Sequence, residues 1–132
     1  MRVHPKLIDI PVHRDARGAL AVVEGVFPVQ RVYFLFDVQA GAARGGHAHK
    51  TLTQLFLVPS GSYSVAIRDG LNEAETFTMS DPSKGLLLPP GYWREIFGFS
   101  SGGVCLVLAS HIYCEEDYLR DFEQYVKWKH SL

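Results

Sequence analysis

The stretch Gly41-Ala42-Ala43-Arg44-Gly45-Gly46-His47-Ala48-His49 decides the fold, and it runs on through Gln54 to Gly61. It places two histidines one residue apart, between a glycine-rich turn and the apolar run 55–58. Alternate side chains of a strand point to the same face, so His47 and His49 are expected to project together. An exposed strand face is the alternative, but the flanking apolar run favours a buried strand. Two imidazoles that titrate near neutrality suit metal ligation or proton transfer.

The rest of the chain consists mainly of short alternating or apolar runs separated by glycine and proline. β-Branched and aromatic residues are frequent in them, as is typical of strands. We expect strands near 7–12, 19–24, 30–37, 53–59, 63–68, 75–79 and 104–109. Many short strands with this punctuation favour an all-β barrel or sandwich over an α/β plan. The first strand is expected at a sheet edge or as an arm exchanged between subunits.

The pattern changes after residue 114. Apolar residues recur at helical spacing from Tyr118 to Val126, with acidic residues at 115–117 before them and basic residues at 127–130 after them. This order complements a helix dipole. We predict one amphipathic carboxy-terminal helix over about 115–130. A length of 132 residues favours a single domain over 1–132, with its barrel over about 5–112.

Charge and composition narrow the possible partners and the compartment. The chain has 13 basic and 14 acidic residues, a formal net charge of -1, which creates no field that would recruit nucleic acid or an anionic membrane. No apolar stretch is long enough to span a bilayer and no leader-like run is evident, so we expect a cytoplasmic protein. Cys105 and Cys114 are expected as free thiols.

Two further residues stand out beside the histidines. In the segment 30–37 strict alternation places Arg31, Tyr33 and Leu35 on one face of a strand. A buried tyrosine hydroxyl needs a partner; in the cavity of the histidines Tyr33 would act as a proton donor or orienting group, and otherwise it is a tyrosine of the barrel rim. Arg44 stands just before the histidines and suits a bidentate contact with a carboxylate or phosphate.

The spacing of these residues resembles the first cupin motif, on which Gly41, His47, His49 and Gly61 fall. Gln54 stands where that motif has its glutamate ligand. The run 89–94 resembles the second motif, with Arg94 in place of the last histidine ligand. An amide binds divalent cations poorly and a guanidinium has no lone pair to offer. The resemblance therefore implies a single cupin barrel, a double-stranded β-helix or jelly roll, that holds no metal.

A closer resemblance is to the sugar 3,4-ketoisomerases with a WxcM-like cupin domain. It covers nearly the whole chain from about Asp15 to Tyr125. The departure from the pattern is Gly46, where relatives often carry a bulkier residue, and it affects the shape of the pocket beside His47. The runs that carry the resemblance are Arg31-Val32-Tyr33, 44–50, Trp93-Arg94-Glu95, Phe99-Ser100-Ser101, 107–110 and 116–121.

This resemblance implies an activity and roles for the candidate residues. The substrate would be a dTDP-linked 4-keto-6-deoxyhexose, the reaction would need no cofactor, and the enzyme would be a homodimer. His47 would be the base that carries the proton between C3 and C4, with His49 and Tyr33 exchanging the O3 and O4 protons. The remaining candidates would contact the sugar or the diphosphate; they are Arg17, Arg44, Gln54, Arg94 and Trp93, of which Trp93 could equally be core.

Three other functions are compatible with the same residues. The first is a nucleotide-sugar epimerase built on this barrel, since it also removes a proton beside a ketone. The second is a metal-dependent cupin that uses His47 and His49 with an unusual third ligand. The third is a sugar-binding module without catalysis, which would have little use for two near-neutral bases.

Overall fold

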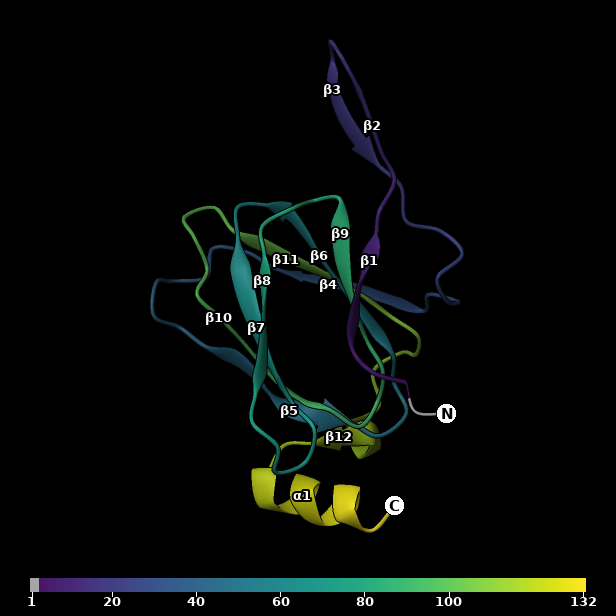
Figure 1. The fold of residues 1–132 in the computed structure, drawn as a ribbon, viewed down its shortest axis with the longest axis vertical. Coiled ribbons are helices and arrows are strands. Elements are labelled where there is room, and N and C mark those ends of the chain that lie inside the picture. Colours follow the sequence, from purple (N-terminus) through teal and green to yellow (C-terminus); the bar gives the residue numbers. More distant parts are fainter. Residues whose placement is uncertain (1–2) are drawn as a thin grey trace.

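In the computed structural model, which describes residues 3–132, two five-stranded antiparallel sheets face each other (Figure 1). The first sheet contains, in spatial order, β1 (Lys6–Asp9), β9 (Lys84–Leu88), β6 (Gln54–Ser60), β11 (Val104–Ala109) and β4 (Arg31–Leu35). The second contains β12 (Tyr118–Leu119), β5 (Arg44–His49), β10 (Trp93–Phe97), β7 (Tyr63–Arg68) and β8 (Glu75–Met79). This all-β jelly-roll arrangement confirms the predicted fold class.

The space between the sheets is filled by apolar side chains of alternating positions. In β7 every second residue is buried, and β4 has half-buried Arg31, Tyr33 and Leu35 alternating with exposed Val32 and Phe34. The alternation predicted for β4 is therefore confirmed. It directs Tyr33 into the barrel, where Tyr33 and Leu35 pack against the main core cluster.

The carboxy-terminal segment differs from the prediction of one helix over 115–130. Residues Glu115–Asp117 form a short 3₁₀ turn, β12 follows, and the helix α1 covers only Phe122–His130. The physical reason is the cap at Asp121, whose side chain accepts a hydrogen bond from the backbone of Gln124 at 3.0 Å. The acidic residues expected at the helix start lie outside it.

The helix α1 is tied to the turn between β9 and β10. Gly91 has φ +93, a value that favours glycine, and its N–H donates to the carbonyl of His49 at 2.8 Å. The carbonyl of Gly91 accepts from Lys129 at 2.7 Å and lies 3.0 Å from the hydroxyl of Tyr125, both on α1. Helix and histidine strand therefore share one backbone anchor.

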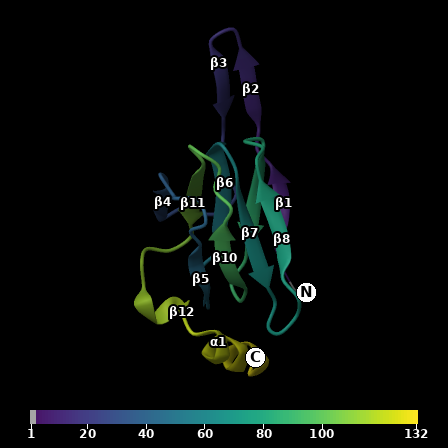
Figure 2. The ribbon, with the colours of Figure 1, turned by 90° about the vertical axis from the view of Figure 1, so that its left-hand side faces the viewer.

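The hairpin of β2 (Val12–Asp15) and β3 (Gly18–Ala21) projects from the barrel at the end opposite α1 (Figure 2). Most of its residues are exposed. The strand β1 that precedes it lies at a sheet edge, as the first strand was expected to do. Within residues 3–132 there is no helix that is both long and apolar enough to cross a membrane.

Candidate active site

Two histidines of β5 form the centre of a hydrogen-bonded chain. The Nε2 atoms of His47 and His49 lie 3.1 Å apart, and Nδ1 of His49 lies 3.0 Å from Oδ2 of Asp117. Oδ1 of Asp117 accepts from the backbone N–H and from the hydroxyl of Thr51, both at 2.7 Å. The pairing of Tyr118 with His49 across the sheet brings Asp117 to this place. We call Asp117, His49 and His47 the carboxylate chain.

The charges around the carboxylate chain determine which of its atoms donate and which accept hydrogen bonds. Burial and the positive charge of Arg94 outweigh Asp117 and lower the pKa of His49 to about 4. Burial opposes ionisation of Asp117, but hydrogen bonds from Thr51 and His49 hold the pKa of its carboxyl below the ordinary value. At neutral pH, neutral His49 therefore donates from Nδ1 to a carboxylate. Its Nε2 is then an acceptor, so a hydrogen bond to it from Nε2 of His47 requires a proton on that nitrogen.

A second chain approaches Tyr33 from the barrel interior. Arg94 donates from Nη1 to Oε1 of Gln54, and Nε2 of Gln54 donates to the hydroxyl of Tyr33 at 2.9 Å. Arg94 and Gln54 are both 1% exposed. Burial raises the pKa of the Tyr33 phenol, against the opposing influence of Arg94 and Gln54. We call Arg94, Gln54 and Tyr33 the guanidinium chain.

The two chains end at one cavity of about 220 Å³. Its wall contains the outermost member of each, His47 and Tyr33, whereas His49, Gln54 and Arg94 lie behind it, fully buried. Three arginines also reach this wall. The residues lining the cavity are Arg31, Tyr33, Leu35, Arg44, His47, Ile96, Tyr118 and Arg120.

Two of the predicted substrate-binding residues lie away from this cavity. The side chain of Arg17 is 91% exposed on the β2–β3 hairpin, where it pairs with Asp15 at 2.6 Å. Trp93 is buried between β10 and α1, with its ring 5.3 Å from that of Phe122 and 5.7 Å from that of Tyr125. A side chain at position 93 of a strand points to the opposite face from Arg94. The alternative of a core tryptophan is the one that the structure supports.

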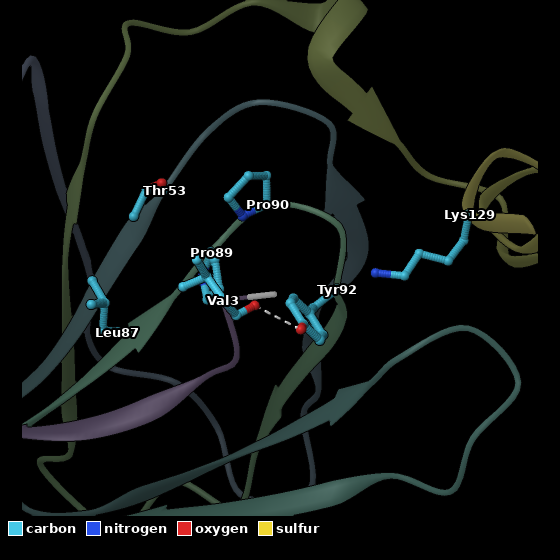
Figure 3. A pocket seen from close by; sticks show the side chains of 7 residues that line it. All are labelled: Val3, Thr53, Leu87, Pro89, Pro90, Tyr92 and Lys129. Carbon is cyan, nitrogen blue, oxygen red and sulfur yellow. Dashed lines mark hydrogen bonds between the residues drawn. The ribbon is translucent and has the colours of Figure 1, made fainter. Parts of the chain in front are cut away.

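A larger cavity, of about 440 Å³, lies near the amino-terminal end and contains neither histidine of the pair (Figure 3). Two of its polar side chains, Tyr92 and Lys129, are engaged within the protein. The hydroxyl of Tyr92 donates to the carbonyl of Val3 at 2.9 Å, and Lys129 contacts Gly91 and pairs with Asp69 at 3.1 Å. The members of the two chains do not line this larger cavity.

Among residues 3–132, no three His, Cys, Asp or Glu side chains gather as a metal site requires. Gln54 and Arg94 occupy the positions of the two missing cupin ligands, and the charge of Arg94 acts on His49 strongly enough to lower the pKa of that imidazole. The guanidinium of Arg94 would repel a metal cation bound beside His49.

Sequence reasoning missed several residues of the site. Asp117 falls in the segment predicted as helix. It lies 68 positions after His49 in the sequence, and the pairing of β12 with β5 brings the two side chains together. Arg31 was placed on the face of Tyr33 but given no role; its guanidinium lies 4.7 Å from the centre of the Tyr33 ring and donates to Tyr118 at 3.2 Å. Arg120 lies over the Tyr118 ring at 4.2 Å.

The chain is similar in sequence and in structure to known sugar 3,4-ketoisomerases. The chain is 38% identical over 127 residues to the TDP-4-oxo-6-deoxy-alpha-D-glucose-3,4-oxoisomerase of Aneurinibacillus thermoaerophilus, covering 93% of this chain and 91% of that enzyme. A mutant of the 3,4-ketoisomerase QdtA from Thermoanaerobacterium thermosaccharolyticum, solved in complex with TDP-4-keto-6-deoxyglucose, superposes with a TM-score of 0.94 at 34% identity, covering 99% of this chain and 97% of that chain.

A more distant structure shares the fold alone. The 3'-monoepimerase ChmJ from Streptomyces bikiniensis, solved with dTDP-quinovose, is 18% identical, with a TM-score of 0.77, and the match covers 86% of this chain and 67% of that chain. The family model described as FdtA: WxcM-like, C-terminal matches residues 3–130, nearly the whole length. On this match and on the level of identity to the oxoisomerase, the chain belongs to the FdtA family of WxcM-like proteins.

Proposed function

We propose that this protein is a sugar-nucleotide 3,4-ketoisomerase that moves the keto group of a dTDP-linked 4-keto-6-deoxyhexose from C4 to C3. The observation that carries the proposal is one cavity whose wall holds both His47 and Tyr33, each hydrogen-bonded to a fully buried side chain, His49 or Gln54. The names of the similar enzymes support the substrate class. Such an isomerisation needs a base, a donor to the sugar oxygen and no redox partner.

In this reaction His47 removes the proton from C3, which the neighbouring C4 carbonyl acidifies. The C–H electron pair becomes the C3–C4 double bond, and O4 develops negative charge and receives a proton. The resulting enediol loses the proton of O3, forms the C3 carbonyl and takes a proton at C4 from His47. A base or acid in position contributes roughly 10²–10⁴-fold. The Tyr33 hydroxyl gives its proton to O4 and its oxygen then takes the proton of O3, so the enzyme gains and loses no net proton. The proton held by His47 exchanges with solvent before it is delivered to C4.

The carboxylate chain supports the base. When His47 gains a proton, its Nε2–H already faces His49, and the Nδ1–H of His49 already faces Asp117. The negative carboxylate therefore stabilises the imidazolium through a neutral ring. Because His49 is fully buried behind His47, we assign it to this relay rather than to direct proton exchange with O3 and O4.

The arginines of the cavity wall are candidates for the diphosphate. Arg31, Arg44 and Arg120 line the same cavity, and guanidinium groups bind phosphate oxygens in bidentate geometry. Arg44 is exposed at the start of β5, whereas Arg120 already pairs with Glu115 at 2.9 and 3.0 Å. A phosphate at Arg120 would therefore compete with a carboxylate, whereas Arg44 and Arg31 have no such pairing in the described part of the chain.

We further propose that the protein is a cytoplasmic homodimer. The two free cysteines suit a reducing compartment. On the outer side of the first sheet Phe34 and Phe36 are 56% and 59% exposed, with ring centres 5.6 Å apart. A second copy seated on such apolar surface would bury it. The projecting hairpin would then carry Arg17 towards the cavity of the partner.

The function is tested by proton NMR of chelator-treated protein in deuterated water with dTDP-4-keto-6-deoxyglucose. We expect a 3-keto product with deuterium at C4, no product with His47→Asn, and full activity without added metal. Exchange at C3 or C5 without the 3-keto product would instead show an epimerase. Activity that returns only with a divalent cation would overturn the metal-free assignment.

The dimer is tested by mixing two inactive variants, Arg17→Ala and His47→Asn. If hairpins cross between subunits, mixed dimers contain one intact site and part of the activity returns. If Arg17 serves no partner site, either Arg17→Ala is active by itself or mixing restores nothing. Sedimentation velocity of Phe34→Glu, with Glu75→Gln as an exposed control, reports the assembly directly.

A further inference from the structure

Gln54 and Arg94 stand in the positions of two cupin metal ligands, yet neither reaches the cavity wall. Both are 1% exposed, whereas Tyr33, to which they lead, lines the cavity. Direct contact of Gln54 or Arg94 with a sugar therefore requires the wall to open. Their hydrogen bonds run instead to one another, to Tyr33 and, from Nη2 of Arg94 at 3.5 Å, to the carbonyl of Tyr92.

The hydrogen bonds of this chain can run in one direction only. A guanidinium has donors and no acceptor, so the atom of Gln54 that faces Arg94 must be the carbonyl oxygen. The amide nitrogen of Gln54 then faces Tyr33 and donates to its hydroxyl. Because that hydroxyl accepts from Gln54, its own proton points away from Gln54.

Burying the charged guanidinium of Arg94 lowers the stability of the folded protein. It is buried, and its Nε–H has no hydrogen-bond partner in the described part of the chain. Burial lowers the pKa of Arg94 to about 10, so the group is still charged at neutral pH. Removing a charge from water costs stability. Destabilising features such as a buried cation beside a cavity are typical of functional sites.

We propose that Arg94 and Gln54 are positioning residues that turn the Tyr33 hydroxyl into a fixed hydrogen-bond donor for the sugar oxygen that becomes negative in the enediol. This inference rests on the proposed function. Arg94 orients the amide of Gln54, and the amide orients the phenol. Gln54 also supplies a hydrogen bond that strengthens as charge develops on the Tyr33 oxygen. Neither residue touches the substrate.

The kinetic test combines Gln54→Leu with Tyr33→Phe. With Tyr33 present, we expect Gln54→Leu to lower kcat about tenfold, the value of one hydrogen bond, and to leave KM within about twofold. In the Tyr33→Phe background the same change should have no further effect on kcat. A rise in KM with unchanged kcat, or equal losses in both backgrounds, would show that Gln54 contacts the sugar itself.

A second variant reverses the direction of the chain. Gln54→Glu keeps the size of the side chain but places an acceptor opposite Tyr33, so the phenol proton turns towards position 54. We expect a larger fall in kcat than for Gln54→Leu, about 10²-fold. Equal or higher activity of Gln54→Glu would refute the directional role. Tyr63→Phe is the matched control, because it removes the buried bond from Tyr63 to the carbonyl of Leu57, 2.6 Å long, outside the site.

A readout without substrate separates this inference from the proposed function. In protein labelled with ¹³C at tyrosine Cζ, the Tyr33 signal is assigned by its loss in Tyr33→Phe. We expect this signal to move more in Gln54→Leu and in Arg94→Met than in Tyr63→Phe, which changes a neighbour in the same core cluster but no member of the chain. If the enzyme fails to isomerise the sugar but the signal moves, only the function is wrong. If the signal stays in place, Arg94 and Gln54 do not orient the hydroxyl of Tyr33.

Discussion

The carboxylate chain and the guanidinium chain are built alike but deliver opposite chemistry. Each is a run of three side chains with an ionised group at its inner end, half-buried Asp117 or fully buried Arg94, and one cavity-lining group at its outer end. Asp117 can only accept, so each ring before it donates inwards and His47 is left as a base. Arg94 can only donate, so Tyr33 accepts from behind and is left as a donor. The sign of the innermost charge determines the role of the outermost group.

The strongest way to break this comparison is Asp117→Asn. Thr51 donates to one oxygen of Asp117, so the amide nitrogen of asparagine is directed to His49. Two donors would then face each other, and His49 must move its proton to Nε2. We expect kcat to fall about 10²–10⁴-fold, as when a base is held in the wrong tautomer.

The control for this change is Thr51→Val, which leaves the carboxylate but removes the hydroxyl donor. It should reduce activity far less than Asp117→Asn. Steady-state kinetics with both variants, after a check of folding by circular dichroism, is the measurement. Equal activity of Asp117→Asn and the unaltered protein would mean that the carboxylate does not direct the base.

Tyr33→Phe breaks the other chain at its outer end. The substitution keeps the ring under Arg31 but removes the donor to the enediol oxygen. We expect kcat to fall about 10²–10³-fold, the usual effect of losing one such donor. Deuterium exchange at C3 in the NMR assay should slow in parallel. Rapid exchange with slow product formation would instead place Tyr33 in the later protonation step.

The neutral state of buried His49 predicts a pH-dependent stability. Its pKa is about 4 in the folded protein, against about 6.5 when unfolded, so the unfolded chain binds more protons between these values. Stability contributed at neutral pH is therefore lost as pH falls from 6.5 towards 4, by up to about 3 kcal/mol. Urea unfolding across this range, compared with His49→Gln, measures it. Parallel curves would show that His49 is not buried as a neutral ring.

Trp93→Phe should have the smallest effect on turnover, because Trp93 belongs to neither chain. It packs against Phe122 and Tyr125 beneath α1, and the smaller ring should cost about 1–2 kcal/mol of stability. We expect KM and kcat to stay within about threefold. A large rise in KM would restore the prediction that Trp93 stacks on the substrate.

Local patterns were enough to predict the all-β barrel, two of the three members of the carboxylate chain and one of the three members of the guanidinium chain. Alternation placed His47 with His49 and turned Tyr33 inwards, since both depend only on the two-residue period of a strand. The role of Asp117 was not predicted, because the neighbouring strand β12 is only two residues long. That strand lies within a run whose apolar spacing is typical of a helix. The bond between Gln54 and Tyr33 joins β6 to β4 through β11, a pairing that no local period encodes.

The anchor at Gly91 connects the last helix to the strand of His49, although no residue of α1 lines the cavity of His47 and Tyr33. Lys129 and Tyr125 hold the carbonyl of Gly91 while its N–H holds the strand of His49. A substitution in the tail that loosens this anchor would shift the histidine ring by a fraction of an ångström. In a random mutagenesis screen, tail variants would then score as slow enzymes with normal expression and could be mistaken for active-site lesions.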